Sequence, residues 1–323
     1  MKAAVNTRYG PPDVVQIREV PTPQPRAGEL RVKVHATTVT RTDCGMRAPH
    51  PWFVRLGAGL FRPKCSILGM DFAGVVEALG PGVTGWQVGE HVFGLSPDVY
   101  GAHAEYLCVP ASGAVVRMPA GARFDNCVVG EGAWYAETYL QSFELQAGHR
   151  LLIHGASGAI GSAAVQLAKA RGATVTAVVA TRHVELAKAL GADRVVDYQA
   201  EDFTRIGARF DAVFDAVGKT SYFRCRPLLE PGGVFAATDL GPGWQNVWLP
   251  LWSAITGQRR VIFPLPQAGR ARAVLEALRA HMQAQRFRAV IDRHYALDAI
   301  AEAYAYVETG EKTGIVVIDI VAR

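Results

Sequence analysis

One stretch constrains the fold of this chain more than any other, because it joins a strand pattern to a helix pattern through regularly spaced glycines. Residues 151–169 read LLIHGASGAIGSAAVQLAK. The apolar or semi-polar residues 151–154 predict a short buried strand, and the Ala-, Val- and Leu-rich segment 159–171 predicts a helix. A strand, a glycine turn and a helix in this order can bind a dinucleotide, since the helix offers free N–H groups and a positive dipole to phosphates.

The glycines of this turn have separate expected tasks. They stand at intervals of three, although Ala156 replaces the first glycine of the usual G-x-G-x-x-G pattern. We expect Gly158 to let a pyrophosphate approach the backbone and Gly161 to let the helix pack closely on its strand. A plain tight turn is the alternative for such a motif. The predicted nucleotide contacts in this loop are Gly155, Ala156, Ser157, Gly158, Ala159, Ile160 and Gly161.

The sequence after the glycine turn keeps alternating between strand and helix patterns, which favours nucleotide binding over a plain turn. The expected elements are strands at 174–179, 194–197, 210–214 and 234–237 and a helix at 183–190. Such alternation predicts a doubly wound parallel sheet with helices on both faces. By contrast, residues 1–120 have β texture, with expected strands at 30–39, 74–79, 90–95 and 104–110 separated by turns rich in Gly and Pro. Two helices, at 267–285 and 297–308, and a strand at 315–321 are expected to end the chain.

Composition and charge narrow the class of protein. A length of 323 residues, half of them hydrophobic, suits about two globular domains. No apolar run approaches the roughly 18 residues that a membrane-spanning helix needs, and the start MKAAVNTRYG is too polar for a secretory signal, so we expect a cytoplasmic protein. The net charge of +5 is scattered along the chain, which argues against nucleic acid as a partner. The five cysteines contain no CxxC pair and indicate free thiols.

Several motifs occur in a fixed order along nearly the whole chain. They are RTDCGMR (41–47), LGMDFAGVVEALGPGVTGWQVGEHVFG (68–94), AHAEY (102–106), HGASGAIG (154–161), LGADRVVDY (190–198), FDAVFDAVG (210–218) and TGIVVIDI (313–320). In this order they resemble the medium-chain dehydrogenase/reductase superfamily. The resemblance implies an α/β architecture: a GroES-like β domain formed by residues 1–122 and 266–323, an inserted Rossmann domain at 123–265, and an active site in the cleft between them.

Three positions distinguish this chain from the zinc-dependent members of that family. Where zinc alcohol dehydrogenases have two cysteines and a histidine as ligands, this sequence has Thr40, Met70 and, by alignment, Glu131. A hydroxyl, a thioether and one carboxylate are poor zinc ligands, and the four-cysteine structural lobe is missing, so no metal is expected. The chain then resembles the zinc-free quinone oxidoreductases and enoyl or enone reductases, which pass hydride from NADPH to an electron-poor C=C bond or a quinone. A zinc-free carbonyl or imine reductase and a non-catalytic NADPH-binding protein are the alternatives.

Charge at the end of the second strand predicts which nucleotide binds. NAD-selective sites carry an acid there, whereas this chain offers Thr181 and Arg182, a hydroxyl and a cation suited to a 2′-phosphate. Arg182 as an ordinary surface residue at the start of the next helix is the alternative. By resemblance, Tyr198 is expected on the adenosine side, and Val217, Gly218, Asp239 and Leu240 in loops near the ribose and nicotinamide.

At the reacting end the sequence nominates four side chains: Arg41, Asp43, Glu131 and Tyr135. Arg41 suits the binding of an enolate, a carboxylate or a phosphopantetheine-like group, and a surface ion pair between Arg41 and Asp43 is the alternative. Tyr135 stands where relatives often have Thr near the nicotinamide, so its phenol is expected to bind the substrate carbonyl or donate a proton; a buried packing role is the alternative. Glu131 is expected to orient the nicotinamide or to hold a proton, unless it only caps a helix.

Two apolar stretches bear on the substrate and on assembly. Residues 48–64, with Trp52, Phe53, Leu60 and Phe61, suit a lid over a small apolar carbonyl or quinone substrate. Residues 241–257 carry three tryptophans and suit a substrate wall, a membrane-contacting patch or a dimer surface. The family resemblance favours a homodimer.

Overall fold

The computed structural model describes residues 1–50, 52–256 and 260–321. The chain forms two compact units: the first is made of Met1–Glu131 with Gln267–Arg323, and the second is Gly132–Pro266. The chain therefore leaves the first unit once and returns to it. The sequence-based division started the inserted domain at residue 123 and ended it at 265, whereas the second compact unit starts at Gly132 and ends at Pro266.

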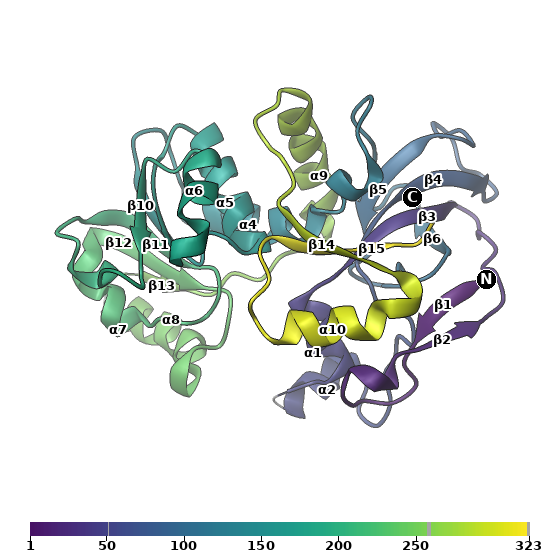
Figure 1. Ribbon diagram of the computed structural model, residues 1–323, viewed down its shortest axis with the longest axis horizontal. Coiled ribbons are helices and arrows are strands. Elements are labelled where there is room, and N and C mark those ends of the chain that lie inside the picture. Colours follow the sequence, from purple (N-terminus) through teal and green to yellow (C-terminus); the bar gives the residue numbers. More distant parts are fainter. Residues whose placement is uncertain (51, 257–259, 322–323) are drawn as a thin grey trace. The chain divides into compact units, whose positions relative to one another are not determined.

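The first unit is built on a seven-stranded sheet with the strand order β14-β15-β3-β4-β5-β7, and β6 pairs with β3 beside this path. The strands are β3 (Glu29–Val39), β4 (Asp71–Leu79), β5 (His91–Leu95), β6 (Tyr106–Pro110), β7 (Val115–Arg117), β14 (Ile291–Ala296) and β15 (Ile315–Asp319). β15, drawn in yellow in Figure 1, pairs antiparallel with the purple β3. The end of the chain thus completes the sheet that its beginning starts.

Strand β3 shows why this sheet forms. Its buried residues Leu30, Val32 and Val34 alternate with Arg31 and Lys33, which are not buried, so one face of the strand turns to the core and the other away from it. The core of the sheet gathers apolar side chains of β3, β4, β5 and their neighbours, among them Phe72, Val76, Val92, Leu107 and Val115.

The other elements of the first unit are β1 (Lys2–Val5), β2 (Gln16–Glu19), α1 (Arg41–Arg47), α2 (Arg55–Ala58), α3 (Phe124–Cys127), α9 (Ala268–Gln283) and α10 (Ile300–Glu308). Helix α1 begins where the sequence supplies a capping box: the Thr40 hydroxyl accepts from the Asp43 N–H, and the Asp43 carboxylate accepts from the Thr40 N–H. Helix α4 (Gly130–Ser142) contains the point in the sequence where one unit ends and the other begins.

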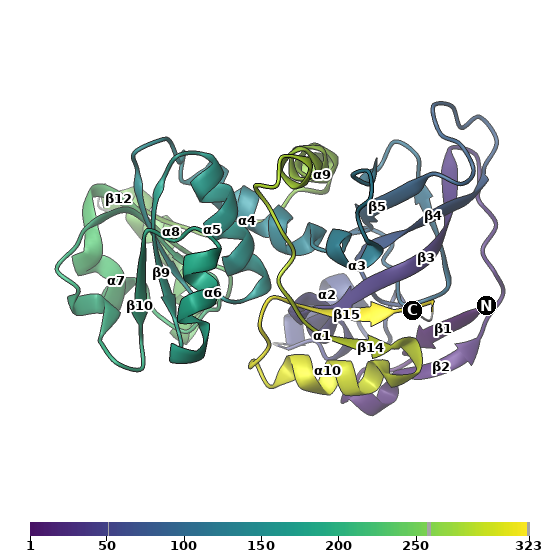
Figure 2. The same ribbon diagram turned by 45° about the horizontal axis from the view of Figure 1, so that its top comes forward.

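The second unit contains a six-stranded sheet with the order β10-β9-β8-β11-β12-β13, in which every recorded pair is parallel. The strands are β8 (Arg150–His154), β9 (Thr174–Val179), β10 (Arg194–Asp197), β11 (Phe210–Asp215), β12 (Leu229–Ala237) and β13 (Arg260–Ile262). The helices after β8 and β9 are α5 (Ala159–Ala170) and α6 (Val184–Ala189), and those after β11 and β12 are α7 (Tyr222–Cys225) and α8 (Gln245–Thr256). In Figures 1 and 2, α5 and α6 lie on one face of the sheet and α7 on the other. This is the doubly wound arrangement that the alternating pattern predicted.

Helix α8 is one of several helices that were missed in the sequence analysis, together with α1 and α4. Residues 245–256 form α8, although the segment was considered only as an apolar surface. Pro250 lies inside this helix, and an internal proline is a signal that normally argues against a helix. Tertiary packing overrides the signal, because Leu249 of α8 is fully buried in the core that also contains Val261 of β13.

Candidate functional site

The predicted nucleotide contacts follow the carboxyl ends of five neighbouring parallel strands. Residues 155–161 follow β8, Thr181 and Arg182 follow β9, Tyr198 follows β10, Val217 and Gly218 follow β11, and Asp239 and Leu240 follow β12. Because the strands are parallel, their carboxyl ends meet at one edge of the sheet. Strand β8 lies between β9 and β11, at the point where the strand order reverses. Open α/β sheets bind their ligands at this point, and we call this set of residues the nucleotide cradle.

The glycines of the cradle differ in the space around them. A Cβ at Gly161 would stand 2.2 Å from the Gly155 carbonyl oxygen and 2.8 Å from the Ala156 Cα, so only glycine allows this close approach of helix and turn. Gly155 has φ +79° and Val217 packs against it. A Cβ at Gly158 would meet only the Gly155 carbonyl oxygen, at 3.7 Å. Gly158 is also the N-cap of α5 and carries no side-chain cap, which leaves the start of this helix open to an anion.

Two loops at the other side of the cradle touch each other. A Cβ at Gly218, which has φ +67°, would stand 2.3 Å from the Asp239 Cβ, so the loops after β11 and β12 pack without any space between them. The Asp239 carboxylate accepts from the Leu240 N–H at 2.6 Å, and the Asn246 side chain donates to the Asp239 carbonyl oxygen at 2.8 Å. These contacts fix the shape of the cradle below Val217, whose side chain is partly exposed.

The ends of β9 and β10 are also joined. The Thr181 hydroxyl donates to Asp197 Oδ2 at 2.6 Å, the Gln199 N–H donates to Asp197 Oδ1 at 2.9 Å, and the Thr181 N–H donates to Gln199 Oε1 at 3.1 Å. Arg182 is exposed at the tip of this loop. Tyr198, next to Asp197, is 52% exposed, so its ring is available to a ligand.

A buried His–Asp pair at the base of the cradle was missed in the sequence analysis. His154 Nδ1 lies 3.0 Å from Asp215 Oδ1, and these residues end β8 and β11 respectively. Asp215 also accepts from the N–H groups of Val217 and Thr220. The pair thus holds the loop after β11 against the strand that carries the glycine turn. The sequence signal was weak: His154 ends one predicted strand, and Asp215 directly follows another.

In the first unit, three carboxyl groups are buried close to one another: Asp43, Asp71 and Glu131, which we call the carboxyl cluster. Asp71, which the sequence analysis did not nominate, accepts from the Glu131 N–H at 3.0 Å and shares a hydrogen bond of 3.1 Å with the Thr38 hydroxyl. Asp43 accepts from Thr40 and from the Gly69 N–H. Asp43 thus ties α1 to the segment that precedes β4.

Glu131 differs from the other two members of the cluster because only one of its carboxyl oxygens has a hydrogen-bond partner among the described residues. The Thr42 hydroxyl donates to Glu131 Oε1 at 2.5 Å. Glu131 Oε2 is buried and has no hydrogen-bond partner within the part of the chain that the structure describes. A buried carboxylate oxygen without a partner is costly, whereas a protonated carboxyl can leave one oxygen unpaired at much lower cost.

Electrostatics favour protons on this cluster. Burial, and after it the charge of Glu131, raises the pKa of the Asp71 carboxyl to about 8. Burial also raises the pKa values of Asp43 and Glu131, which lie close enough to affect each other. Burial has the opposite effect on an ammonium group: it lowers the pKa of Lys312 to about 8, although the charges of Glu131 and Asp292 act to raise this pKa. Three neighbouring buried carboxyl groups cannot all be charged without a strong opposing charge, because each negative charge raises the pKa of the others. The cluster therefore holds protons at neutral pH.

The comparisons with known proteins agree with this arrangement. The alcohol dehydrogenase GroES-like domain model matches residues 26–120, and the zinc-binding dehydrogenase model matches residues 190–318. A trans-enoyl reductase from Aspergillus terreus is 31% identical and covers 90% of this chain and 86% of its own length. An NADPH-dependent alkenal/one oxidoreductase from Arabidopsis thaliana is 27% identical, and the alignment covers 98% of this chain and 79% of the relative. The solved quinone oxidoreductase from Coxiella burnetii has a TM-score of 0.87 at 28% identity and covers 99% of both chains.

The chain belongs to the medium-chain dehydrogenase/reductase superfamily. It lies on the branch of this oxidoreductase family that contains quinone oxidoreductases and enoyl reductases. The fold implied by the sequence motifs, a GroES-like domain with a Rossmann domain, is confirmed.

The three residues that the sequence analysis aligned with zinc ligands make other contacts in the structure. Met70 is buried, the Thr40 hydroxyl is used in the cap of α1, and Glu131 Oε1 is occupied by Thr42. The residues that the structure describes include no group of three His, Cys, Asp or Glu side chains arranged to hold a metal ion. The donor set therefore does not fit a tetrahedral zinc ion, which prefers thiolate and imidazole ligands.

The remaining nominated side chains lie as follows. Arg41 is exposed at the first position of α1. The alternative surface pair between Arg41 and Asp43 is wrong, because Asp43 is 0% exposed and both its oxygens are used by Thr40 and Gly69. Tyr135 is a half-buried residue of α4 whose ring lies 6.2 Å from that of Trp134.

The described residues of the two apolar stretches include several large exposed side chains. Trp52, Leu60 and Phe61 of the predicted lid are exposed by 69%, 51% and 87%. On α8, Val247, Trp248, Leu251 and Ile255 form an exposed apolar row. None of the helices in the described ranges is both long and apolar enough to span a membrane.

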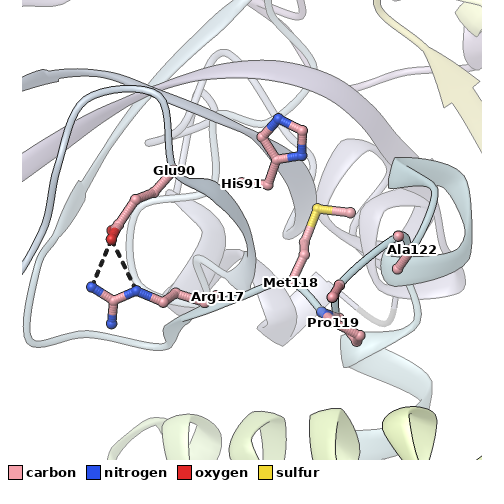
Figure 3. A pocket seen from close by; sticks show the side chains of 8 residues that line it. Glu90, His91, Arg117, Met118, Pro119 and Ala122 are labelled. Atoms are coloured by element: carbon pink, nitrogen blue, oxygen red, sulfur yellow. Dashed lines mark hydrogen bonds and ion pairs between the residues drawn. The ribbon is translucent and has the colours of Figure 1, made fainter.

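A surface pocket of the first unit lies apart from the carboxyl cluster. Figure 3 shows Glu90, His91, Arg117, Met118, Pro119 and Ala122 around it. Arg117 is already held by two hydrogen bonds to Glu90 and packs over the Trp86 ring. The pocket therefore offers no uncompensated cation to an anionic ligand, and we assign no reaction to it.

Proposed function

We propose that this protein is an NADPH-dependent reductase that transfers hydride to the C=C bond of an α,β-unsaturated carbonyl compound, or to a quinone, without a metal ion. The observation that carries the proposal is Glu131. It stands where zinc-dependent relatives have a metal ligand, yet it is a buried carboxyl with one unpaired oxygen beside two other buried carboxyls. Such a site suits the storage of a proton better than the binding of a cation.

The nucleotide cradle is the proposed NADPH site. The open start of α5 at Gly158 suits the pyrophosphate, and Thr181 with Arg182 suits the 2′-phosphate of the adenosine. Tyr198 offers an exposed ring to the adenosine, and the loops at Val217, Gly218, Asp239 and Leu240 are assigned to the ribose and nicotinamide. When bound, the nicotinamide supplies the hydride. The Arabidopsis thaliana relative is NADPH-dependent by its name, which supports the same cofactor for this chain.

The reduction of a C=C bond also consumes a proton, and Glu131 with Thr42 is the proposed source. Thr42 is half-buried and shares a hydrogen bond with Glu131. A protonated Glu131 can pass its proton to the Thr42 oxygen while the Thr42 hydroxyl gives its own proton to the substrate enolate. Glu131 is then a carboxylate that accepts from the Thr42 hydroxyl, and it regains its proton from solvent. Positioned acids of this kind accelerate a reaction about 10²–10⁴-fold.

Arg41 and Tyr135 are proposed to stabilise the negative charge that develops on the substrate oxygen. Arg41 is an exposed cation one residue before Thr42, and Tyr135 carries a half-buried phenol. A guanidinium or a phenol O–H that meets an enolate oxygen lowers the barrier, because charge develops there in the transition state. Asp43 serves Arg41 and Thr42 indirectly, since its carboxylate caps the helix that carries them.

The exposed apolar stretches support proposals about the kind of substrate and about the assembly of the protein. The exposed apolar side chains of Trp52, Leu60 and Phe61 suit an uncharged, apolar acceptor. The exposed row on α8 lies beside the edge strand β13, and we propose that this region forms a homodimer, as apolar rows on an exposed surface mark interaction sites. We also propose that the protein is located in the cytoplasm.

The proposal is tested with the purified protein, NADPH and a panel of enones, enals, enoyl thioesters, quinones, ketones and imines. We expect NADPH oxidation with at least one alkene or quinone, no stoichiometric zinc by elemental analysis, and full activity in a strong chelator. Reduction of ketones or imines alone would identify the carbonyl or imine reductase. Tight NADPH binding without turnover of any acceptor would identify a binding protein, and about one zinc per chain would contradict the metal-free mechanism.

A further inference from the structure

The end of β9 carries no acid, but an acid from the next strand reaches the same place. Asp197, the last residue of β10, accepts the Thr181 hydroxyl at 2.6 Å. Its other oxygen accepts the Gln199 N–H, and the Gln199 side chain returns to the Thr181 N–H. The carboxylate is thus held against the residue that was assigned to the 2′-phosphate.

We propose that Asp197 is a specificity-determining residue that weakens the preference of this protein for NADPH over NADH. The inference rests on the proposed use of the nucleotide cradle by a nicotinamide cofactor. Asp197 supplies from β10 the acidic group that NAD-selective proteins of this fold place at the end of the second strand.

The first reason is that the Thr181 hydroxyl has only one proton to donate. While Thr181 donates it to Asp197, the same hydroxyl cannot donate to a 2′-phosphate. NADPH therefore has to displace this hydrogen bond before Thr181 can hold the phosphate, whereas the ribose 2′-hydroxyl of NADH can itself donate to Asp197 or to Thr181.

The second reason is charge. A 2′-phosphate that contacts Thr181 lies within a few ångströms of the Asp197 carboxylate, and like charges at such a distance repel each other even when solvent screens them partly. Asp197 is half-buried, so the screening is incomplete. Arg182, exposed on the same loop, acts in the opposite direction and keeps NADPH the better ligand.

The test is a fluorescence titration that gives the Kd values of NADPH and NADH for matched variants. Asp197→Asn keeps an acceptor for the Gln199 N–H, and its amide can donate to Thr181, which frees the hydroxyl proton. We expect this variant to bind NADPH about tenfold more tightly and NADH no more tightly than the parent protein. Asp197→Ser removes the charge in a smaller side chain and is expected to shift the ratio of Kd values in the same direction.

Two controls separate the mechanism from a general loss of negative charge. Glu201→Gln removes an exposed charge from the same loop and is expected to change the NADPH affinity less than twofold. Thr181→Val, combined with Asp197→Asn, is expected to remove most of the gain, since no hydroxyl is left to free. An unchanged or lowered preference for NADPH in both Asp197 variants would overturn the inference while leaving the proposed function intact. Failure of the parent protein to bind either nucleotide would instead refute the proposed function itself.

Discussion

The nucleotide cradle and the carboxyl cluster are built by opposite means. The cradle uses mostly backbone: glycines that permit close approaches, an uncapped helix start and loops at five strand ends. The cluster uses side chains: three buried carboxyls, with the hydroxyls of Thr38, Thr40 and Thr42 around them. Backbone donors keep their charge distribution at any pH, whereas buried carboxyls change theirs with a proton. One unit is therefore suited to holding a ligand and the other to handling a proton, and each prediction below tests one side of this contrast.

The largest effect is expected at Gly161, where the cradle has no spare room. Gly161→Ala places a Cβ 2.2 Å from the Gly155 carbonyl oxygen, so we expect a loss of about 1–3 kcal/mol in the free energy of unfolding and at least a hundredfold weaker NADPH binding. Chemical denaturation and fluorescence titration measure the two quantities. Gly158→Ala is the matched control, since its Cβ meets only one atom at 3.7 Å; it is expected to unfold like the parent protein. Equal stability of the two variants would mean that the turn is not packed as described.

A slightly smaller effect is expected at Glu131, on the side of the cluster. Glu131→Gln keeps the shape and the hydrogen bond to Thr42 but carries no acidic proton, so we expect kcat for an enone to fall about a hundredfold with an unchanged Kd for NADPH. Reduction of benzoquinone is expected to suffer much less, because the hydroquinone anion takes its proton from water. Thr42→Val is expected to resemble Glu131→Gln, and Thr42→Ser the parent protein. Equal losses with both acceptors would show that Glu131 supports the structure and is not a proton source.

Asp71 gives a pH-dependent stability. Its pKa is raised to about 8 by burial, so the folded protein retains a proton that the unfolded chain has lost, and the free energy of unfolding falls as pH rises through this range. His103, whose pKa burial lowers to about 4, acts in the opposite sense only below about pH 6.5. Between pH 6.5 and 8 we expect the free energy of unfolding to decline by about 1–2 kcal/mol less in Asp71→Asn than in the parent protein, measured by denaturation at each pH. The same slope in the variant and the parent protein would contradict a protonated Asp71.

The smallest effect is expected at Arg182, an exposed side chain at the rim of the cradle. Arg182→Ala removes one cation from the proposed 2′-phosphate site, so NADPH should bind about tenfold more weakly and NADH nearly unchanged. Arg205→Ala, which removes another exposed cation from the same unit, is a control that should leave both affinities unchanged. If titration gives the parent protein equal Kd values for the two nucleotides, the charge argument for NADPH is wrong.

The same contrast accounts for what the sequence could predict. The cradle follows from local patterns, because a glycine turn directly between a strand and a helix specifies its own geometry, and parallel strands bring their ends together. The cluster joins residues far apart in the chain: Asp71 meets Glu131 across 60 positions, and Lys312 comes from the segment before β15. No local signal marks Asp71 as buried or Glu131 as half-satisfied. Asp43 was nominated as a reacting residue, yet in the structure its contacts are those of a helix cap and a tie to Gly69.

The position of the transferred hydride tests the central claim most directly. The protein is incubated with NADPH deuterated at C4 and with an enone that it reduces, and the product is analysed by mass spectrometry and NMR. The proposed function predicts one deuterium at the β-carbon and a solvent-derived proton at the α-carbon, with the carbonyl group intact. Deuterium at the carbinol carbon, with the C=C bond untouched, would contradict it.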